Sequence, residues 1–326
     1  MKAKNFLLTL ACTSVLTLGA ALPSVAATLP DPIRLVVGYP PGGTADAVAR
    51  AYAEKLRTAL GVSVVVDNRA GAGGQVAAQS FQQAPKNGSA LLVANNHMMS
   101  TLPLTVPTVT YDPVKDFTPV ATIAQFEHIL SVGKNTPANT LDEYIELARK
   151  EPSKYGMFGI PAAGSAPHFI GYTVGKKADV TLTPVPYRGG APLLTDLLGG
   201  HIPAGVDAIG TITEFVAKGD VKVLAVTGKE RLALLKDVPT FTELGYENLE
   251  ASGWMGIFAP VGTDPELVKR LEAAFNEVGK NADIEKTLVP LGFLPTSGTA
   301  KELAETLQND LDTWGPIIKE SGYVAQ

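Results

Sequence analysis

The apolar positions near the start of the chain change their period within a few residues. Residues 35–37 form a short β-branched apolar run, which is typical of a buried strand. The turn at residues 40–43 follows, with the sequence Pro-Pro-Gly-Gly. Apolar residues then recur at the spacing of a helix with one buried face, namely Ala45, Val48, Ala49, Tyr52, Leu56 and Ala59. The pattern predicts a strand, a tight turn and an amphipathic helix.

Strand-like and helix-like segments alternate through most of the sequence. Strands are expected near residues 35–38, 63–67, 90–94, 120–123, 130–132, 154–158, 183–185, 205–208, 221–226, 253–258 and 292–294. The clearest helices are expected at residues 44–60, 141–150, 167–175, 191–198, 265–280 and 300–318. Such alternation is typical of α/β layers with mainly parallel sheets.

Two of the later helices carry strong local signals. The residues at 263–266, Thr-Asp-Pro-Glu, combine a cap, a proline in the first turn and an early acid, which is typical of a helix start. The last helix carries a continuous apolar stripe made of Leu303, Leu307, Leu311, Trp314 and Ile318. We expect this stripe to pack in the core rather than to bind a partner.

The first 27 residues have the pattern of a secretory signal peptide. Lys2 and Lys4 precede an apolar run at residues 6–22, and small residues at 24–27 predict cleavage after about Ala26 or Ala27. The run is too short and too rich in Ala, Thr and Ser for a strong membrane anchor, and no later stretch could span a bilayer. The sequence thus predicts an exported, soluble protein. The single cysteine, Cys12, lies in this leader, so the mature chain is expected to have no disulfide or thiol nucleophile.

The net charge and the length of the chain restrict its binding partners and its number of domains. Without the two leader lysines, the chain has 25 of its 27 basic residues against 32 acidic ones, a net charge of −7. This charge disfavours nucleic acid and anionic membranes as partners.

The mature chain of about 300 residues is longer than a single hydrophobic core usually supports, so two domains are expected. No flexible linker separates them. The candidate boundaries lie near residues 125–130 and 245–253, where strands could pass from one lobe to the other.

The first strand-turn-helix predicts an anion site. Gly42 and Gly43 let the backbone approach a bound group, and Thr44 is the expected N-cap. The free N–H groups of the first turn and the helix dipole attract negative charge, such as a carboxylate or phosphate. The alternative is an ordinary βα loop whose glycines only permit the turn.

Two further loops repeat this design. Residues 160–168 form a loop of small residues with Ser165 as the expected N-cap, and residues 186–192 place Tyr187 and Arg188 beside another glycine-rich helix start. Each loop alone is explained by efficient capping, and Arg188 alone could be a structural cation. The three together favour a shared ligand cleft.

Motifs for other chemistries are incomplete. Residues 71–74 resemble a dinucleotide fingerprint, but Val76 occupies the third glycine position, and neither glycine-rich turn continues as a P-loop. The four histidines, His97, His128, His168 and His201, have no partner at metal-ligand spacing. A nucleophile elbow is absent, and Ser165 and His168 are expected to face the same ligand rather than each other. The sequence predicts no catalysis, no metal and no cofactor.

Six segments together resemble the Bug-type, tripartite tricarboxylate transporter family of extracytoplasmic solute-binding proteins. They are YPPGGTADAVAR (39–50), VVVDNRAGAGG (64–74), AGSAPHF (163–169), PYRGGAPLLTDLLGGHI (186–202), VLAVTGKERLALLKDVPTFTELGY (223–246) and WMGIFAPVGTDP (254–265). Their order and spacing extend the resemblance from about Ile33 to the C-terminus.

The resemblance implies a periplasmic protein with a two-lobed α/β fold, the type II periplasmic-binding-protein fold, and a ligand held between the lobes. The implied division is a leader at residues 1–27, a first lobe of residues 28–125 and 248–326, and a second lobe of residues 126–247. The ligand positions implied on the first lobe are Tyr39, Gly42, Gly43, Thr44 and Asp46. Those implied on the second are Ser165, His168, Tyr187, Arg188, Gly189 and Asp207.

The chain also departs from the family pattern. The loop before Ser165 is stiffer and less polar than usual, and Pro167 stands where a polar residue is common. His97, followed by Met98 and Met99, could line the far end of the cleft and favour an apolar or aromatic ligand body, or a second carboxylate. The alternative places the methionines in the core and His97 at the surface.

The leading hypothesis is a monomeric receptor that captures a small carboxylate-bearing organic acid by lobe closure and delivers it to a tripartite tricarboxylate-type membrane permease. The ligand would be a di- or tricarboxylate, an acidic amino acid or an aromatic acid. One alternative is a sensing role, in which the closed form docks on a membrane sensor kinase. Another is an exported hydrolase that uses Ser165 and His168.

Overall fold

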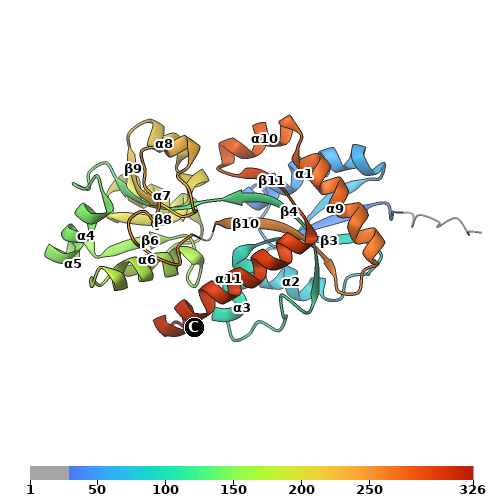
Figure 1. Cartoon of the computed structure of the whole chain (residues 1–326), viewed down its shortest axis with the longest axis horizontal. Helices are drawn as coiled ribbons and strands as arrows, with labels where there is room; N and C mark the ends of the chain where they lie inside the picture. Colours follow the sequence, from blue (N-terminus) through green and yellow to red (C-terminus); the bar gives the residue numbers. More distant parts are fainter. Residues whose placement is uncertain (1–28, 251, 326) are drawn as a thin grey trace, which may run out of the picture.

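Two β-sheets divide the chain into two α/β lobes (Figure 1). The computed structural model describes residues 29–250 and 252–325, so the expected leader, with Cys12, lies outside the described residues. The expected α/β, two-lobed architecture is confirmed. Within the described part, no helix has both the length and the apolar character needed to cross a membrane.

The first lobe is built on a six-stranded sheet in the order β11-β4-β10-β3-β1-β2. Its strands are β1 (Ile33–Val37), β2 (Val64–Asn68), β3 (Ala90–Asn95), β4 (Phe117–Phe126), β10 (Gly253–Pro260) and β11 (Leu294–Gly298). Strand β1 runs parallel to β2 and β3, whereas β10 runs antiparallel to both β3 and β4. The chain leaves this lobe through β4 and returns through β10, so these neighbours must run in opposite directions.

The second lobe is built on a five-stranded sheet in the order β7-β6-β8-β5-β9. Its strands are β5 (His128–Gly133), β6 (Met157–Ile160), β7 (Thr183–Pro186), β8 (Ala204–Ala208) and β9 (Val221–Val226). Strand β6 pairs in parallel with β7 and β8, but β5 is antiparallel to β8 and β9. The prediction of mainly parallel sheets is therefore wrong, because the strands that connect the lobes introduce antiparallel pairs.

Helices cover both faces of each sheet. In the first lobe they are α1 (Thr44–Leu60), η1 (Ala72–Gly74), α2 (Gln75–Phe81), η2 (His97–Thr101), α3 (Leu102–Thr105), α9 (Pro265–Gly279), α10 (Ala282–Leu288) and η5 (Val289–Leu291). In the second they are α4 (Leu141–Lys150), α5 (Pro152–Tyr155), α6 (Ala166–Lys177), α7 (Gly190–Gly199), η3 (Ile209–Thr211), α8 (Thr213–Ala217) and η4 (Ala233–Leu235). The last helix, α11 (Ala300–Ser321), extends along both lobes (Figure 1).

The strong periodic patterns predicted these elements well. The expected bounds of α1, α4 and β9 agree with the structure, and Asp264 caps α9 through the N–H groups of Glu266 and Leu267. The expected strand at residues 154–158 is wrong in its first half, because residues 152–155 form the single turn α5. The short helices α2, α3 and α10 were not predicted.

The chain passes between the lobes at two strand crossings. Glu127 is the single residue between β4 and β5, and Ser252 precedes β10 on the way back. The carboxylate of Glu127 accepts hydrogen bonds from the hydroxyls of Thr227 and Ser252. One side chain therefore ties the outgoing and returning segments together at the hinge.

Helix α11 is a third connection between the lobes. Four residues of its predicted apolar stripe are buried and Leu311 is partly buried, which confirms the core-packing interpretation, but the stripe contributes to two cores. Leu303 and Leu307 pack in the first lobe with Trp254 and Phe258. Trp314 and Ile318 instead pack in the second lobe, where the Trp314 ring lies 6.5 Å from the ring of Phe169.

Candidate functional site

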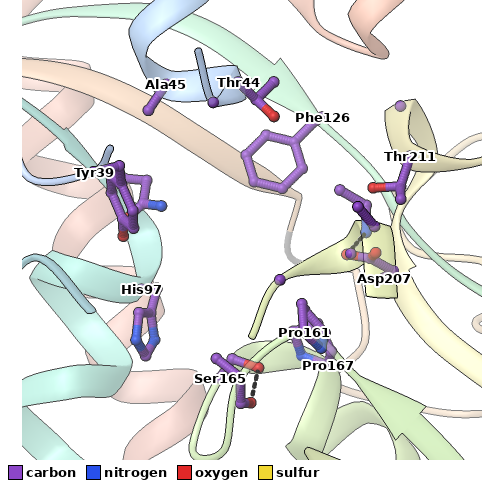
Figure 2. A pocket seen from close by; sticks show the side chains of 18 of the residues that line it. Tyr39, Thr44, Ala45, His97, Phe126, Pro161, Ser165, Pro167, Asp207 and Thr211 are labelled. Carbon is purple, nitrogen blue, oxygen red and sulfur yellow. Dashed lines mark hydrogen bonds between the residues drawn. The ribbon is translucent and has the colours of Figure 1, made fainter. Parts of the chain in front are cut away.

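A cleft of about 830 Å³ lies between the lobes and is lined by both of them (Figure 2). The structure brings ten of the twelve predicted ligand positions to its walls. They are Tyr39, Gly42, Gly43, Thr44, His97, Ser165, Tyr187, Arg188, Gly189 and Asp207. Asp46 and His168 are not among the lining residues.

Helix α1 begins at the wall of the first lobe. Gly42 has a left-handed φ of +79°, which a residue with a side chain rarely adopts, and Gly43 occupies the N-cap position. The expectation that Thr44 is the N-cap is wrong, because Thr44 is already the first helical residue. Its side chain points toward the cleft (Figure 2), so the hydroxyl is free of a capping role.

Asp46 has a structural role behind this helix start. It is 2% exposed, and its Oδ2 accepts hydrogen bonds from the N–H of Gly42 at 2.9 Å and from Arg50 Nε at 2.8 Å. Its Oδ1 accepts from Asn68 Nδ2 at 3.0 Å. The Arg50 guanidinium keeps the pKa of Asp46 below its usual value. Asp46 therefore fixes the turn that presents Gly43 and Thr44 rather than lining the cleft itself.

Helix α6 begins at the wall of the second lobe. Ser165 occupies the N-cap position, as predicted, but its side chain does not cap the helix. Its Oγ donates instead to the carbonyl of Ala162 at 2.7 Å. His168 turns away from the cleft, where its Nδ1 accepts from the Gly164 N–H at 3.2 Å and its ring stacks 5.0 Å from Phe169. Ser165 and His168 are thus engaged separately and form no nucleophile–base pair.

Helix α7 begins beside α6, with Gly189 at its N-cap position and a left-handed φ of +106°. The Tyr187 hydroxyl donates to Asp196 Oδ2 at 2.7 Å, and burial raises its pKa to about 12. Arg188 is exposed on the cleft wall. It makes no hydrogen bond or ion pair with the described residues, so the interpretation as a paired structural cation is not supported.

Side-chain capping distinguishes these three helices from the others of comparable length. Among the described helices of ten or more residues, α4, α9 and α11 are capped by the side chains of Thr140, Asp264 and Thr299. Helices α1, α6 and α7 have no side-chain cap, and each of them begins at the cleft. Their first-turn N–H groups and dipoles are left to interact with whatever enters the cleft, and an anion is the matching charge.

Asp207 is a buried carboxylate on the same wall. It is 6% exposed, and its Oδ1 accepts from the N–H of Ala208 at 2.7 Å. A methyl group on Gly190, the first residue of α7, would lie 2.3 Å from Asp207 Oδ2, so this oxygen is packed against the helix start. Burial raises the pKa of Asp207 to about 6.

The far wall of the cleft carries neutral polar groups. The Tyr39 hydroxyl donates to Asn95 Oδ1 at 2.8 Å, and His97 Nδ1 lies 2.8 Å from the Thr101 hydroxyl. Burial lowers the pKa of His97 to about 4, so the imidazole is neutral near pH 7. His97 lines the cleft, whereas Met98 and Met99 lie fully buried in the core of the first lobe.

Sequence reasoning missed the wall at the hinge. Phe126 at the end of β4, His128 at the start of β5 and Phe293 before β11 all line the cleft. The available signal was weak: two aromatic rings flank an acid in the segment singled out as a possible crossing between the lobes. Within residues 29–250 and 252–325, no three His, Cys, Asp or Glu side chains gather as a metal site.

Two α/β lobes joined by crossing strands around a cleft are the architecture of two-lobed periplasmic binding proteins. Residues 48–323 match the model of the tripartite tricarboxylate transporter family receptor. The chain belongs to that family of solute receptors.

Individual relatives match over almost the whole chain. The protein BugT of Bordetella pertussis is 29% identical over 94% of this chain and 95% of its own length. The periplasmic binding protein BugD has a similar structure, with a TM-score of 0.77, 28% identity and coverage of 90% and 98% of the two chains. The R. palustris protein Rpa4515, solved with adipate, has a TM-score of 0.80 at 31% identity, covering 90% and 97%.

Proposed function

We propose that this receptor binds a small carboxylate-bearing organic acid in the periplasm and delivers it, chemically unchanged, to a tripartite tricarboxylate-type permease. The observation that carries the proposal is the contrast in capping: the three long helices without a side-chain cap are those that begin at the cleft. Backbone N–H groups can hold a carboxylate without a buried lysine, whose own desolvation would be costly. The adipate bound to Rpa4515 is an acid of this class.

A thermal-shift screen tests the ligand class. The mature chain is mixed with mono-, di- and tricarboxylates, amino acids, aromatic acids and neutral sugars, and its melting temperature is measured. A ligand at about 100 times its dissociation constant should add about 2.7 kcal/mol of stability, which is readily seen. Stabilisation by neutral sugars with no effect of any carboxylate would overturn the proposal.

Delivery requires a second measurement. We expect deletion of the gene to abolish uptake of the identified acid, and a plasmid copy to restore it. Uptake that continues at the wild-type rate in the deletion strain would contradict the transport role.

Carboxylate affinity should depend on the charge of Asp207. Its carboxylate adjoins the start of α7, and burial raises its pKa to about 6. As the pH rises from 5.5 to 8, Asp207 ionises and repels a bound anion, so we expect affinity to fall by about 1 kcal/mol, or roughly fivefold. Asp207→Asn should bind adipate more tightly than the wild type at pH 8 and lose this component of the pH dependence.

Calorimetric titrations across this pH range give the measurement. The titration of the ligand itself is common to both proteins, so the difference between them reports on Asp207. Asp312→Asn, at an exposed position of α11, is the matched control and should follow the wild type. Parallel pH profiles for wild type and Asp207→Asn would contradict the assignment.

A further inference from the structure

The wall of the cleft at the hinge is aromatic. Figure 2 shows the ring of Phe126 projecting into the cleft at the end of β4. Its centroid lies 4.9 Å from the ring of Phe293 and 5.3 Å from the imidazole of His128, which meets it edge to face. All three rings line the cleft although each side chain is mostly buried. The rings are therefore held in fixed positions, with only part of each available to a ligand.

None of the three rings carries a charge near pH 7, and the carboxylate that adjoins them, Asp207, lies on β8 next to the strand of His128. Among the described lining residues, the charged groups are Arg188 and Asp207, both on the second lobe beside α7. Burial lowers the pKa of His128 to about 4, and its Nδ1 has no hydrogen-bond partner in the described part of the chain. A carboxylate placed against this wall would lose its hydration without gaining a positive partner.

Apolar groups of the second lobe lie across the cleft from Phe126, which belongs to the first lobe. Pro161 and Pro167, from the loop before α6 and its first turn, lie on the opposite side of the cleft in Figure 2. A ligand body in this part of the cleft would have two aromatic rings on one side and two pyrrolidine rings on the other. A flat, apolar group fits such a space, because aromatic rings gain most from offset or edge-to-face contact with another ring.

We propose that the ligand is an aromatic carboxylic acid whose carboxylate lies at the helix starts and whose ring lies against Phe126 and Phe293. The inference rests on the proposed function, since it assumes that a carboxylate occupies the cleft. It makes Phe126 and Phe293 the residues that select the ligand body. His128 completes the wall as a neutral ring.

Three acids serve as probes in calorimetric titrations of the mature chain. Benzoate has a flat ring, cyclohexanecarboxylate has a puckered ring of the same size, and adipate has a second carboxylate and no ring. We expect benzoate to bind at least tenfold more tightly than either of the others. Adipate binding as tightly as benzoate, or more tightly, would overturn the inference.

Phe126→Leu tests the wall itself, because leucine keeps an apolar side chain but removes the aromatic ring. We expect at least a tenfold loss of benzoate affinity and less than a threefold change for adipate. Phe293→Leu should act in the same direction. Phe275→Leu is the matched control, since Phe275 is also buried in the first lobe but does not line the cleft, and it should leave both affinities unchanged.

The melting temperature of each variant without ligand shows whether it folds. An equal loss for benzoate and adipate in Phe126→Leu would indicate a structural role alone and contradict the inference. Binding of adipate without benzoate would overturn the aromatic ligand and leave the proposed function standing. Failure of every carboxylate to bind would overturn both.

Discussion

Replacing Gly210 with alanine is expected to weaken carboxylate binding about 100-fold. Gly210 lies in η3 of the second lobe, and the new methyl group would be 1.8 Å from the carbonyl oxygen of Leu291 in η5 of the first lobe. No adjustment of a side chain can relieve a clash with backbone. The lobes would have to separate at this edge of the cleft. If the arrangement of the lobes described above fell to about 1% of the population, the apparent affinity would fall by about the same factor.

Calorimetric titration with benzoate and adipate measures this effect, and small-angle X-ray scattering reports the separation of the lobes. Gly210 does not have a left-handed φ, so alanine adds no backbone strain within its own lobe. Gly315→Ala is the control, because a methyl group there meets nothing within 4 Å. Wild-type affinity in Gly210→Ala would show that this contact is not needed for binding.

The second large effect concerns stability. Trp314→Ala should lower the free energy of unfolding by about 3–5 kcal/mol, the usual cost of removing a large aromatic side chain from a core. Trp314 is 1% exposed and packs in the second lobe against elements that lie far from it in the sequence. The cavity would open where α11 passes from one lobe to the other.

Urea unfolding followed by circular dichroism gives this value. Gln308→Ala changes an exposed side chain of the same helix, on the part that packs against the first lobe, and should remain within about 0.5 kcal/mol of the wild type. A loss below about 1 kcal/mol in Trp314→Ala would mean that α11 contributes little to the second lobe.

Local patterns carried most of the correct predictions. The spacing of apolar residues predicted α1 and α4 correctly, because each helix buries one face. That spacing is set within the helix and does not depend on residues far away in the sequence. The glycine-rich helix starts were also visible, since glycine and proline act on their own turn. Whether two strands pair in parallel or antiparallel cannot be predicted from a local pattern. It depends on which strand returns to which lobe, and β10 lies more than 120 residues beyond β4 in the sequence.

In the cleft, too, the features set by neighbouring residues could be predicted, and those that depend on contacts between distant residues could not. The family resemblance placed Asp46 among the ligand positions, but Arg50 and Asn68 bind its carboxylate. The sequence cannot distinguish a ligand-binding acid from a buried acid that shapes a turn. The pairing of Phe126 with Phe293 joins positions far apart in the chain, so no spacing rule could reveal it. A shared cleft could be predicted from repeated helix starts, whereas its aromatic wall required the fold.

The packing of α11 also bears on the order in which the molecule can form. The second lobe lacks two of its core side chains, Trp314 and Ile318, until the last residues of the chain are present, and the sheet of the first lobe lacks β10 and β11 until a similar stage. Domains generally fold as units during synthesis, starting from the N-terminus. Here neither lobe has its complete core or sheet until late in synthesis, so we expect both lobes to finish folding only after α11 has been made.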